Sequence, residues 1–243
     1  AIGYAALDAQ TTGSGYNVAV GYNSMTANTS GTENTASGWN TLAANTTGNY
    51  NVAFGGAALA ANTTAANNTG VGFKALNVNT TGARNTGLGF KALIANTTAS
   101  SCTALGGLAL QANTTGSVNT GCGDASLYSN TTGSNNTACG QGALFANTTA
   151  DNNTAVGTEA GAAITTGGLN CLLGSLSGDN ITTGSQNICI GNSTSTSSVS
   201  STNQIVMGQG VTGNSNSSFA FGDHGTDTVC TFGQTTWSAP SDI

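Results

Sequence analysis

The chain has 243 residues, of which 36 are glycine and only 5% are charged, and its formal net charge is −6. So few charges argue against a solvated helical protein and against ordinary disorder, which combines high net charge with low hydrophobicity. The three basic residues, Lys74, Arg84 and Lys91, are too few for a nucleic-acid phosphate footprint, and no run of 18 apolar residues could insert into a membrane.

A 17-residue repeat begins at the start of the chain, where Ile2-Gly3 and Ala6-Leu7 already fit it, and continues to Gly208. From Gly21 to Gly140, leucine, or Met25, stands four residues after the repeated glycine, and asparagine stands seven after it, from Asn28 to Asn147. A unit this short buries surface only against its neighbours, so the repeat predicts an array. The predicted structural glycine column consists of Gly21, Gly38, Gly55, Gly72, Gly89, Gly106, Gly123, Gly140, Gly157, Gly174, Gly191 and Gly208.

The length of the repeat favours one coil of a parallel β-solenoid. Two packed helices need about 33 residues or more, and Gly, Asn and Thr in every repeat oppose helix formation. Each coil is expected to hold two or three short strands and to stack about 4.8 Å from the previous one. The predicted fold is therefore all-β, a parallel β-solenoid of about 12 to 13 coils with 17-residue repeats.

A strand is predicted just before each glycine, as in NVAVG, NVAFG and NTAVG. Alternation places the residues one and three positions before the glycine on one face and the residue between them on the other. We expect the first face to join the leucines in the core, as a ladder of Val20, Phe54, Val71, Leu88, Leu105, Val156, Leu173, Ile190 and Met207. The predicted leucine column of the core is Leu42, Leu59, Leu76, Leu93, Leu110, Leu127 and Leu144.

The other strand face carries only alanine or glycine in the first coils. Such small residues allow another backbone to approach closely. A coil of this size also encloses a thin core, so association would add the burial that one chain lacks. We therefore expect a seam between chains at Ala19, Ala36, Ala53, Gly70, Gly87 and Ala104.

The ANTTG segment of each repeat is predicted to be a turn, in which stacked Asn and Thr side chains bond from coil to coil. Each Asn-Thr-Thr is also a motif for N-glycosylation. Because the turn itself demands the same residues, the motif can equally be incidental.

Near the C-terminus, NQIVMG ends on Gly208 and SSFAFG ends on Gly222, so the final repeat is a shorter, 14-residue one. These segments resemble the NSVAIG-type repeats of trimeric autotransporter adhesin heads, and the resemblance implies left-handed parallel β-rolls wound as homotrimers. The 17-residue repeats look like a longer-looped version, with the asparagine one position closer to the glycine. The resemblance extends over residues 1–222.

The last residues, TTWSAPSDI, resemble the junction at which phage tail fibres enter a self-cleaving intramolecular chaperone domain. The resemblance implies Ser241 as the processing serine, but the partner lysine is absent and no cleavage is expected. The predicted organisation is a 17-residue-repeat solenoid over residues 1–191, variant coils with one 14-residue repeat over 192–233, and a tail over 234–243 that leads to a missing C-terminal domain.

Few residues could support catalysis. The single histidine, His224, stands beside Asp223 and Asp227 in a glycine-rich turn, where polar residues are usually structural. Glu33 and Glu159 are not spaced as a general acid and base, and no phosphate-binding Gly-Lys-Ser/Thr follows any glycine. We therefore expect no enzyme, no cofactor and no catalytic residue.

The six cysteines include no CxxC pair, so a zinc site is not expected. Cys122 and Cys139 share a column one coil apart, which is within the Cα range of a disulfide. Because they replace Val or Leu in the apolar ladder, we favour the interpretation that they are free, buried thiols over a disulfide.

Four aromatic residues directly follow a column glycine and form a candidate surface binding strip: Tyr22, Trp39, Phe73 and Phe90. Binding of a sugar or receptor and covering of the core edge or a neighbouring chain are equally good interpretations.

We expect a structural and adhesive protein, the shaft or head of a trimeric tail fibre or of an extracellular surface filament. Its expected partners are copies of itself, also end to end, and a cell-surface glycan or protein receptor held by many weak contacts. A second hypothesis is ice binding by the ladder Thr46, Thr63, Thr80, Thr97, Thr114, Thr131 and Thr148, although a regular Thr-x-Thr array is missing. A third is a polysaccharide-cleaving tailspike, against which the lack of paired acids counts.

Overall fold

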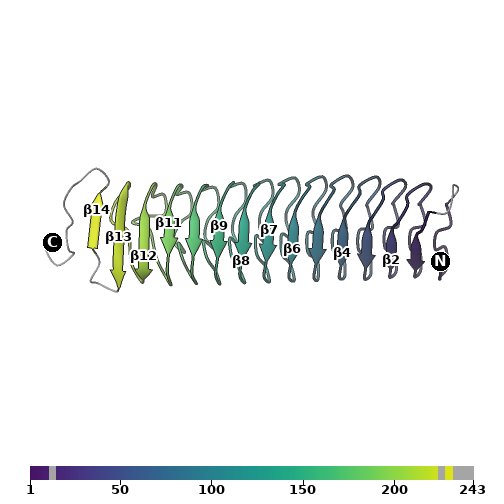
Figure 1. The fold of residues 1–243 in the computed structure, drawn as a ribbon, viewed down its shortest axis with the longest axis horizontal. Coiled ribbons are helices and arrows are strands. Elements are labelled where there is room, and N and C mark those ends of the chain that lie inside the picture. Colours follow the sequence, from purple (N-terminus) through teal and green to yellow (C-terminus); the bar gives the residue numbers. More distant parts are fainter. Residues whose placement is uncertain (11–14, 224–227, 232–243) are drawn as a thin grey trace. The chain divides into compact units, whose positions relative to one another are not determined.

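The structure, a computed structural model, describes residues 1–10, 15–223 and 228–231. The described residues form strands and turns and contain no helix. Their contacts divide the chain into two compact units, Ala1–Ala125 (unit 1) and Ser126–Ile243 (unit 2). In both units short parallel strands follow one another in chain order (Figure 1).

Unit 1 stacks seven strands of three residues each, and each strand pairs in parallel with the next. The partners occupy equivalent positions of successive 17-residue repeats, as in the pairing of Thr69 with Thr86. The strands are β1 (Val18–Val20), β2 (Thr35–Ser37), β3 (Val52–Phe54), β4 (Thr69–Val71), β5 (Thr86–Leu88), β6 (Thr103–Leu105) and β7 (Thr120–Cys122).

Unit 2 continues this pattern and then departs from it. Ile205 of β12 pairs with Phe219 of β13, so the predicted 14-residue repeat forms one shorter coil. The last strand, β14, is antiparallel to β13. The strands are β8 (Thr137–Cys139), β9 (Thr154–Val156), β10 (Cys171–Leu173), β11 (Ile188–Ile190), β12 (Ile205–Gln209), β13 (Ser218–Asp223) and β14 (Thr228–Thr231).

Each coil contains one strand, fewer than the two or three that we expected. The rest of the coil is made of turns whose backbone groups bond to the neighbouring coil. Leu59 N, for example, donates to Ala75 O at 3.0 Å, and Thr46 N donates to Thr63 O at 2.8 Å. The predicted parallel β-solenoid with 17-residue coils is therefore confirmed, and its backbone hydrogen bonds extend well beyond the strands.

The core of unit 1, and of unit 2 as far as Leu144, lies between the middle residue of the strand and the leucine column. In later coils of unit 2 the position of the leucine is taken by Gly161 and Gly178, and the buried large side chain is Leu172 in the middle of its strand. Ala19, Ala36, Ala53 and Ala104 are at most 1% exposed, and the strand glycines Gly70 and Gly87 are buried as well. The leucines fill the space opposite them, because a Cβ atom added at Gly70 would lie 3.3 Å from Leu59 Cγ. All predicted core leucines are fully buried: Leu42, Leu59, Leu76, Leu93, Leu110, Leu127 and Leu144.

The predicted seam between chains at Ala19, Ala36, Ala53, Gly70, Gly87 and Ala104 is therefore wrong. These residues are small because the leucines of their own chain approach them across a thin coil, and no second chain can reach them.

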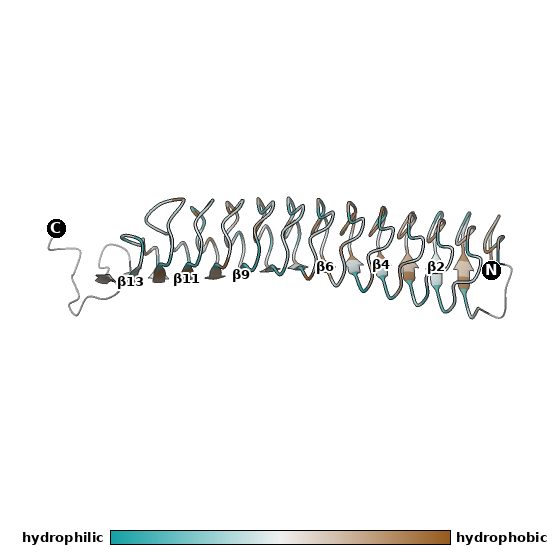
Figure 2. Ribbon diagram, turned by 90° about the horizontal axis from the view of Figure 1, so that it is seen from above, coloured by the Kyte–Doolittle hydropathy of each residue, from teal (hydrophilic) through white to brown (hydrophobic). Residues whose placement is uncertain are grey.

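The apolar ladder that we expected in the core lies on the outside instead. Val20 is 36% exposed, Phe54 is 59% exposed and Leu88 is 48% exposed. In a strand of three residues only the middle side chain points inward, so both of its neighbours point outward. Figure 2 shows hydrophobic colouring on several of these strands and hydrophilic colouring on turns next to them.

Two ladders of buried asparagines connect successive coils. In the first, Asn45 Nδ2 donates to Asn28 Oδ1 at 2.9 Å and to Gly48 O at 3.1 Å. In the second, Asn51 N donates to Asn34 Oδ1 at 2.9 Å. The bonding of Asn from coil to coil is thus confirmed. The asparagines of the NTT motifs are fully buried, so a folded coil cannot present them to a glycosylating enzyme.

The end of the first ladder leaves one polar atom unsatisfied. Within the described residues, Asn147 Oδ1 is the buried side-chain atom without a hydrogen-bond partner. In the other coils of the ladder this oxygen accepts from the asparagine of the following coil, as Asn130 Oδ1 does from Asn147 at 2.7 Å. The next coil has Ile164 at that position, which has no donor, so the ladder ends there.

We expect Asn79→Ala to lower the free energy of unfolding by about 3 kcal/mol, because each buried polar group left unsatisfied costs about 1–3 kcal/mol. The change removes the bonds from Asn79 Nδ2 to Asn62 Oδ1 (3.1 Å) and Gly82 O (2.9 Å), and it removes the acceptor of Asn96 Nδ2 (2.7 Å). Denaturant unfolding measures the loss, and Thr81→Ala, at an exposed position in the same turn, is the control. Equal losses in both variants would contradict a structural role for the ladder.

Candidate interaction surfaces

The strands of unit 1 present an uncharged and partly apolar face, which we call the outer strand face. It consists of the residues one and three positions before each column glycine, and none of them is charged. Exposed apolar side chains recur along it, so it differs from the Asn- and Thr-rich turns. The residues are Val18, Val20, Thr35, Ser37, Val52, Phe54, Thr69, Val71, Thr86, Leu88, Thr103, Leu105, Thr120 and Cys122.

Unit 2 has an outer strand face of the same kind. Leu173 is 48% exposed, and Ile188 and Met207 are each 37% exposed. At its C-terminal end a hollow of about 530 Å³ is lined by Met207, Gly208, Phe219, Phe221 and Gly222. Water-soluble proteins rarely expose extended apolar patches unless something else covers or binds them.

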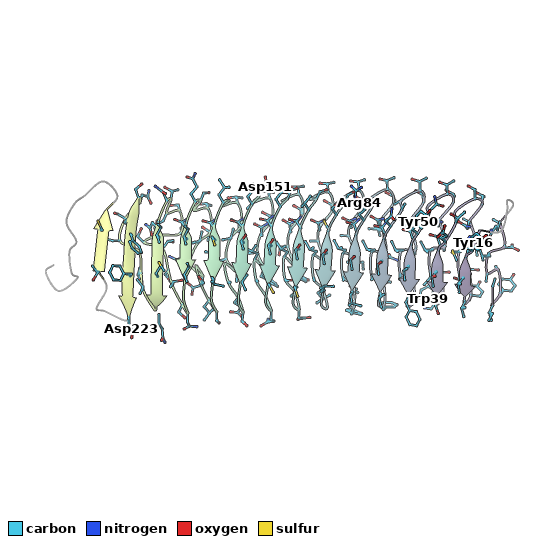
Figure 3. The ribbon with its side chains drawn as sticks, in the orientation of Figure 1. Tyr16, Trp39, Tyr50, Arg84, Asp151 and Asp223 are labelled. Carbon is cyan, nitrogen blue, oxygen red and sulfur yellow. The ribbon has the colours of Figure 1, made fainter. Side chains whose placement is uncertain are left out.

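The aromatic residues of the predicted binding strip lie on the surface of unit 1. Tyr22 is 55% exposed, Trp39 49%, Phe73 41% and Phe90 51%. Phe73 and Phe90 stack with their ring centroids 6.0 Å apart. Trp39 lies beyond the C-terminal end of its strand (Figure 3) and over Gly56 of the next coil, where an added Cβ would meet its Nε1 at 2.5 Å. Within one chain the strip is therefore a surface and does not cover the core.

Sequence reasoning missed three members of this strip. Tyr4 directly follows Gly3, in the same column, and stacks on Tyr22 at 5.5 Å between centroids. Lys74 and Lys91 place Nζ 5.4 Å from the Phe73 centroid and 5.0 Å from the Phe90 centroid. The signal was present as the repeated dipeptide Phe-Lys at the same position of two successive coils.

The threonine ladder proposed for ice binding does not display its hydroxyls. Thr46 Oγ1 donates to Thr63 O at 3.1 Å, and Thr63 Oγ1 donates to Thr80 O at 3.1 Å. These side chains are half-buried in the turn. The threonines that point outward in register lie instead on the outer strand face of unit 1, at Thr69, Thr86, Thr103 and Thr120.

The cysteines are thiols in the structure. Cys122 is half-buried and Cys139 is exposed, and the two do not form a disulfide. We expected both in the core, but both lie on the outer strand face. Cys102 and Cys189 are buried. Burial raises the pKa of the Cys102 thiol, and it raises the pKa of Cys189 to about 12.

We expect the stability of unit 2 to fall above about pH 9 through Cys189. Its pKa is 9.0 in the unfolded chain and about 12 in the fold, so the unfolded state loses its proton first. The stabilisation is complete below pH 9 and is lost as the pH rises toward 12. The test variant is Cys189→Ala, because Ala155 occupies the same column. Between pH 8 and 11, its free energy of unfolding should fall less with rising pH than that of the unchanged chain, as measured by chemical unfolding. An unchanged pH dependence would contradict the assignment to Cys189.

The candidate catalytic residues do not form a site in the described part of the chain. Asp223 ends β13 and is exposed, while His224, Asp227 and Ser241 lie outside the described residues. Glu33 and Glu159 are both exposed. In residues 1–10, 15–223 and 228–231, no group of three or more His, Cys, Asp or Glu side chains could hold a metal ion. No helix in the same residues is long and apolar enough to cross a membrane.

Comparison of the chain with protein-family models, with curated proteins and with solved structures gave no match. The function is therefore inferred from the solenoid and its two surfaces, the outer strand face and the aromatic strip.

Proposed function

We propose that the chain forms the shaft or head of a homotrimeric fibre, in which the outer strand faces of three chains pack against one another around a common axis. The observation that carries this proposal is the outer strand face of unit 1, which has no charged residue and holds Phe54 at 59% and Leu88 at 48% exposure. Complete burial of one such side chain stabilises by about 1.5–3 kcal/mol. Because the face repeats in every coil, this gain would also repeat.

The number of chains is supported by the sequence resemblance to trimeric adhesin heads. A thin coil encloses a core of one leucine column and one alanine or glycine column, which leaves the larger strand residues for an interface between chains. This places the seam on the opposite strand face from the one that we expected from sequence. A fibre of this kind acts outside the cell or on a virion, as a tail fibre or surface filament.

In such a fibre, binding comes from repetition. Each surface position outside the seam recurs on three chains, so weak contacts with a receptor add up by avidity and need no deep pocket.

Ice binding is the second candidate, and it depends on the same face. Thr69, Thr86, Thr103 and Thr120 are paired in register on successive parallel strands, about 4.8 Å apart, beside an apolar column. Such an array can order water only when it is exposed. A trimer would cover it, so the two candidates exclude each other on this face.

The mass of the native particle distinguishes these functions. One chain has a mass of 23.6 kDa, so light scattering should give three times this mass for the fibre. A trimer without a thermal hysteresis gap supports the fibre. A folded monomer that lowers the freezing point without changing the melting point would support ice binding, and a dimer would contradict the proposed threefold seam.

A further inference from the structure

Aromatic rings and lysines follow one edge of unit 1, in what we call the aromatic–lysine strip. It consists of Tyr4, Tyr22, Trp39, Phe73, Lys74, Phe90 and Lys91. The rings directly follow the column glycines, which end the strands, so they stand beside the outer strand face and not on it. Packing of the outer strand faces would therefore leave the strip open to solvent.

The positive charge of the chain is concentrated in the same unit. Residues 1–125 hold all three basic residues and three acidic ones (Asp8, Glu33 and Asp124), so their formal charge is 3 − 3 = 0. Residues 126–243 hold no basic residue and the other six acidic ones, so their formal charge is −6. Two of the three cations, Lys74 and Lys91, stand in successive coils.

The two lysines are held in place but keep their charge available. Lys91 N donates to Phe73 O at 3.0 Å, which fixes one coil against the other, and each ammonium lies 5.0–5.4 Å from the centroid of the neighbouring ring. Within the described residues, no carboxylate forms an ion pair with either lysine. The strip thus offers two cations at the coil spacing, each beside a half-exposed aromatic ring.

We propose that the aromatic–lysine strip binds an anionic polysaccharide with a carboxylate on its sugar rings, a polyuronate. The apolar C–H groups of the sugars would contact the aromatic side chains, and the carboxylates would pair with Lys74 and Lys91. A polymer with a repeating unit suits a surface with a repeating coil, because several weak contacts form together. This inference rests on the proposed fibre function and names the receptor chemistry for it.

Titration calorimetry of the native chain with oligomers of polygalacturonate tests this proposal. Methyl-esterified oligomers of the same length are the uncharged control, and oligothymidylate tests whether any polyanion with stacking groups suffices. The lysine variant is Lys74→Asn with Lys91→Asn, because Asn23 and Asn40 occupy the same column with the same positive φ. The aromatic variant is Phe73→Ser with Phe90→Ser, since Ser175 stands at the equivalent position of a later coil.

A stacked aromatic pair without lysines supplies the matched control. Tyr128 and Phe145 of unit 2 stack at 4.9 Å between centroids, and their column holds Ala162 in the next coil, so both can be changed to alanine. We expect the native chain to bind polygalacturonate, more weakly at higher salt, and we expect each of the two strip variants to lose at least tenfold in affinity. The control variant should bind as the native chain does. Circular dichroism and particle mass identify any variant that misfolds. If the lysine variant or the aromatic variant misfolds, the single change Lys91→Asn is measured instead.

The proposal is overturned if a native trimer does not bind polygalacturonate, if the esterified oligomers or oligothymidylate bind equally well, or if the lysine variant keeps full affinity. A trimer without polyuronate binding leaves the fibre function standing. A monomer that binds polygalacturonate through Lys74 and Lys91 would support the binding site and contradict the trimeric fibre.

Discussion

Replacing Gly72 with alanine is expected to lower the free energy of unfolding by about 3 kcal/mol or more, because an L-residue held at its φ costs about 1–3 kcal/mol and forcing two coils apart adds about 1–3 kcal/mol. Gly72 has a φ of +125°, and a Cβ atom there would lie 2.5 Å from Gly89 O and 2.8 Å from Gly89 C in the next coil. Both neighbouring atoms belong to the backbone, so no side chain can move aside.

Denaturant unfolding of Gly72→Ala should be compared with that of Gly107→Ala. An added Cβ at Gly107 would meet only Asp124 Oδ1, at 2.9 Å, which is the end of a flexible side chain. We expect Gly107→Ala to change the free energy of unfolding by less than about 1 kcal/mol. Similar losses for the two variants would show that the glycine column is not what sets the coil spacing.

Replacing Leu88 with glutamate is expected to convert the proposed trimer into single chains. Leu88 is 48% exposed on the outer strand face, so the change would cost a single chain little. In the proposed seam, however, three carboxylates would be brought close together and away from water. Like charges in an interface cost several kcal/mol, and three leucines are lost as well. Light scattering should therefore fall from three chains to one.

Val118→Glu is the control for Leu88→Glu. Val118 is 55% exposed but lies in a turn outside the outer strand face, in the column where Glu33 stands in another coil. This variant should remain a trimer. Dissociation of Val118→Glu, or a stable trimer of Leu88→Glu, would contradict the location of the seam.

The repeat and its columns were sufficient to predict the solenoid, the strand before each glycine and the buried leucines, but not that each coil has a single strand. The spacing of the glycines determined the predicted coil length, and leucine keeps the same position in each coil from Leu42 to Leu144. The positive φ of the leucines could not be predicted, because residues such as Leu42 (φ 47°) and Leu59 (φ 51°) rarely adopt it outside a fold that imposes it.

The two strand faces were assigned the wrong way round for a physical reason. Alternation separates two faces but does not say which is inside, and we gave the inside to the larger apolar residues. In a thin coil the leucine column already fills the interior, so only alanine or glycine fits opposite it. Considering the volumes of the two facing columns together would have identified the inner face. A column of leucines in a thin coil can only be opposite a column of small residues such as Ala53 and Gly70.

The surfaces were harder to predict than the core. The four aromatic residues of the strip were predicted from their column. The lysines beside them were considered only as too few basic residues for nucleic-acid binding. The outward threonines of the strands were missed because only the threonines of the NTT turns were considered. The hydroxyls of those turn threonines donate to backbone carbonyls of the next coil. In each case the outcome depends on which side of the coil a column faces, which the period does not fix.

Alkylation of the cysteines in the native particle tests the central claim most directly. Cys139 and Cys171 are exposed on the outer strand face of unit 2, whereas Cys102 and Cys189 are buried inside their coils. If the outer strand faces form the seam, iodoacetamide at pH 8 should leave all four thiols unmodified in the native particle and modify them after denaturation. Rapid modification of Cys139 and Cys171, with Cys102 and Cys189 still protected, would show that the face is open to solvent and would contradict the fibre.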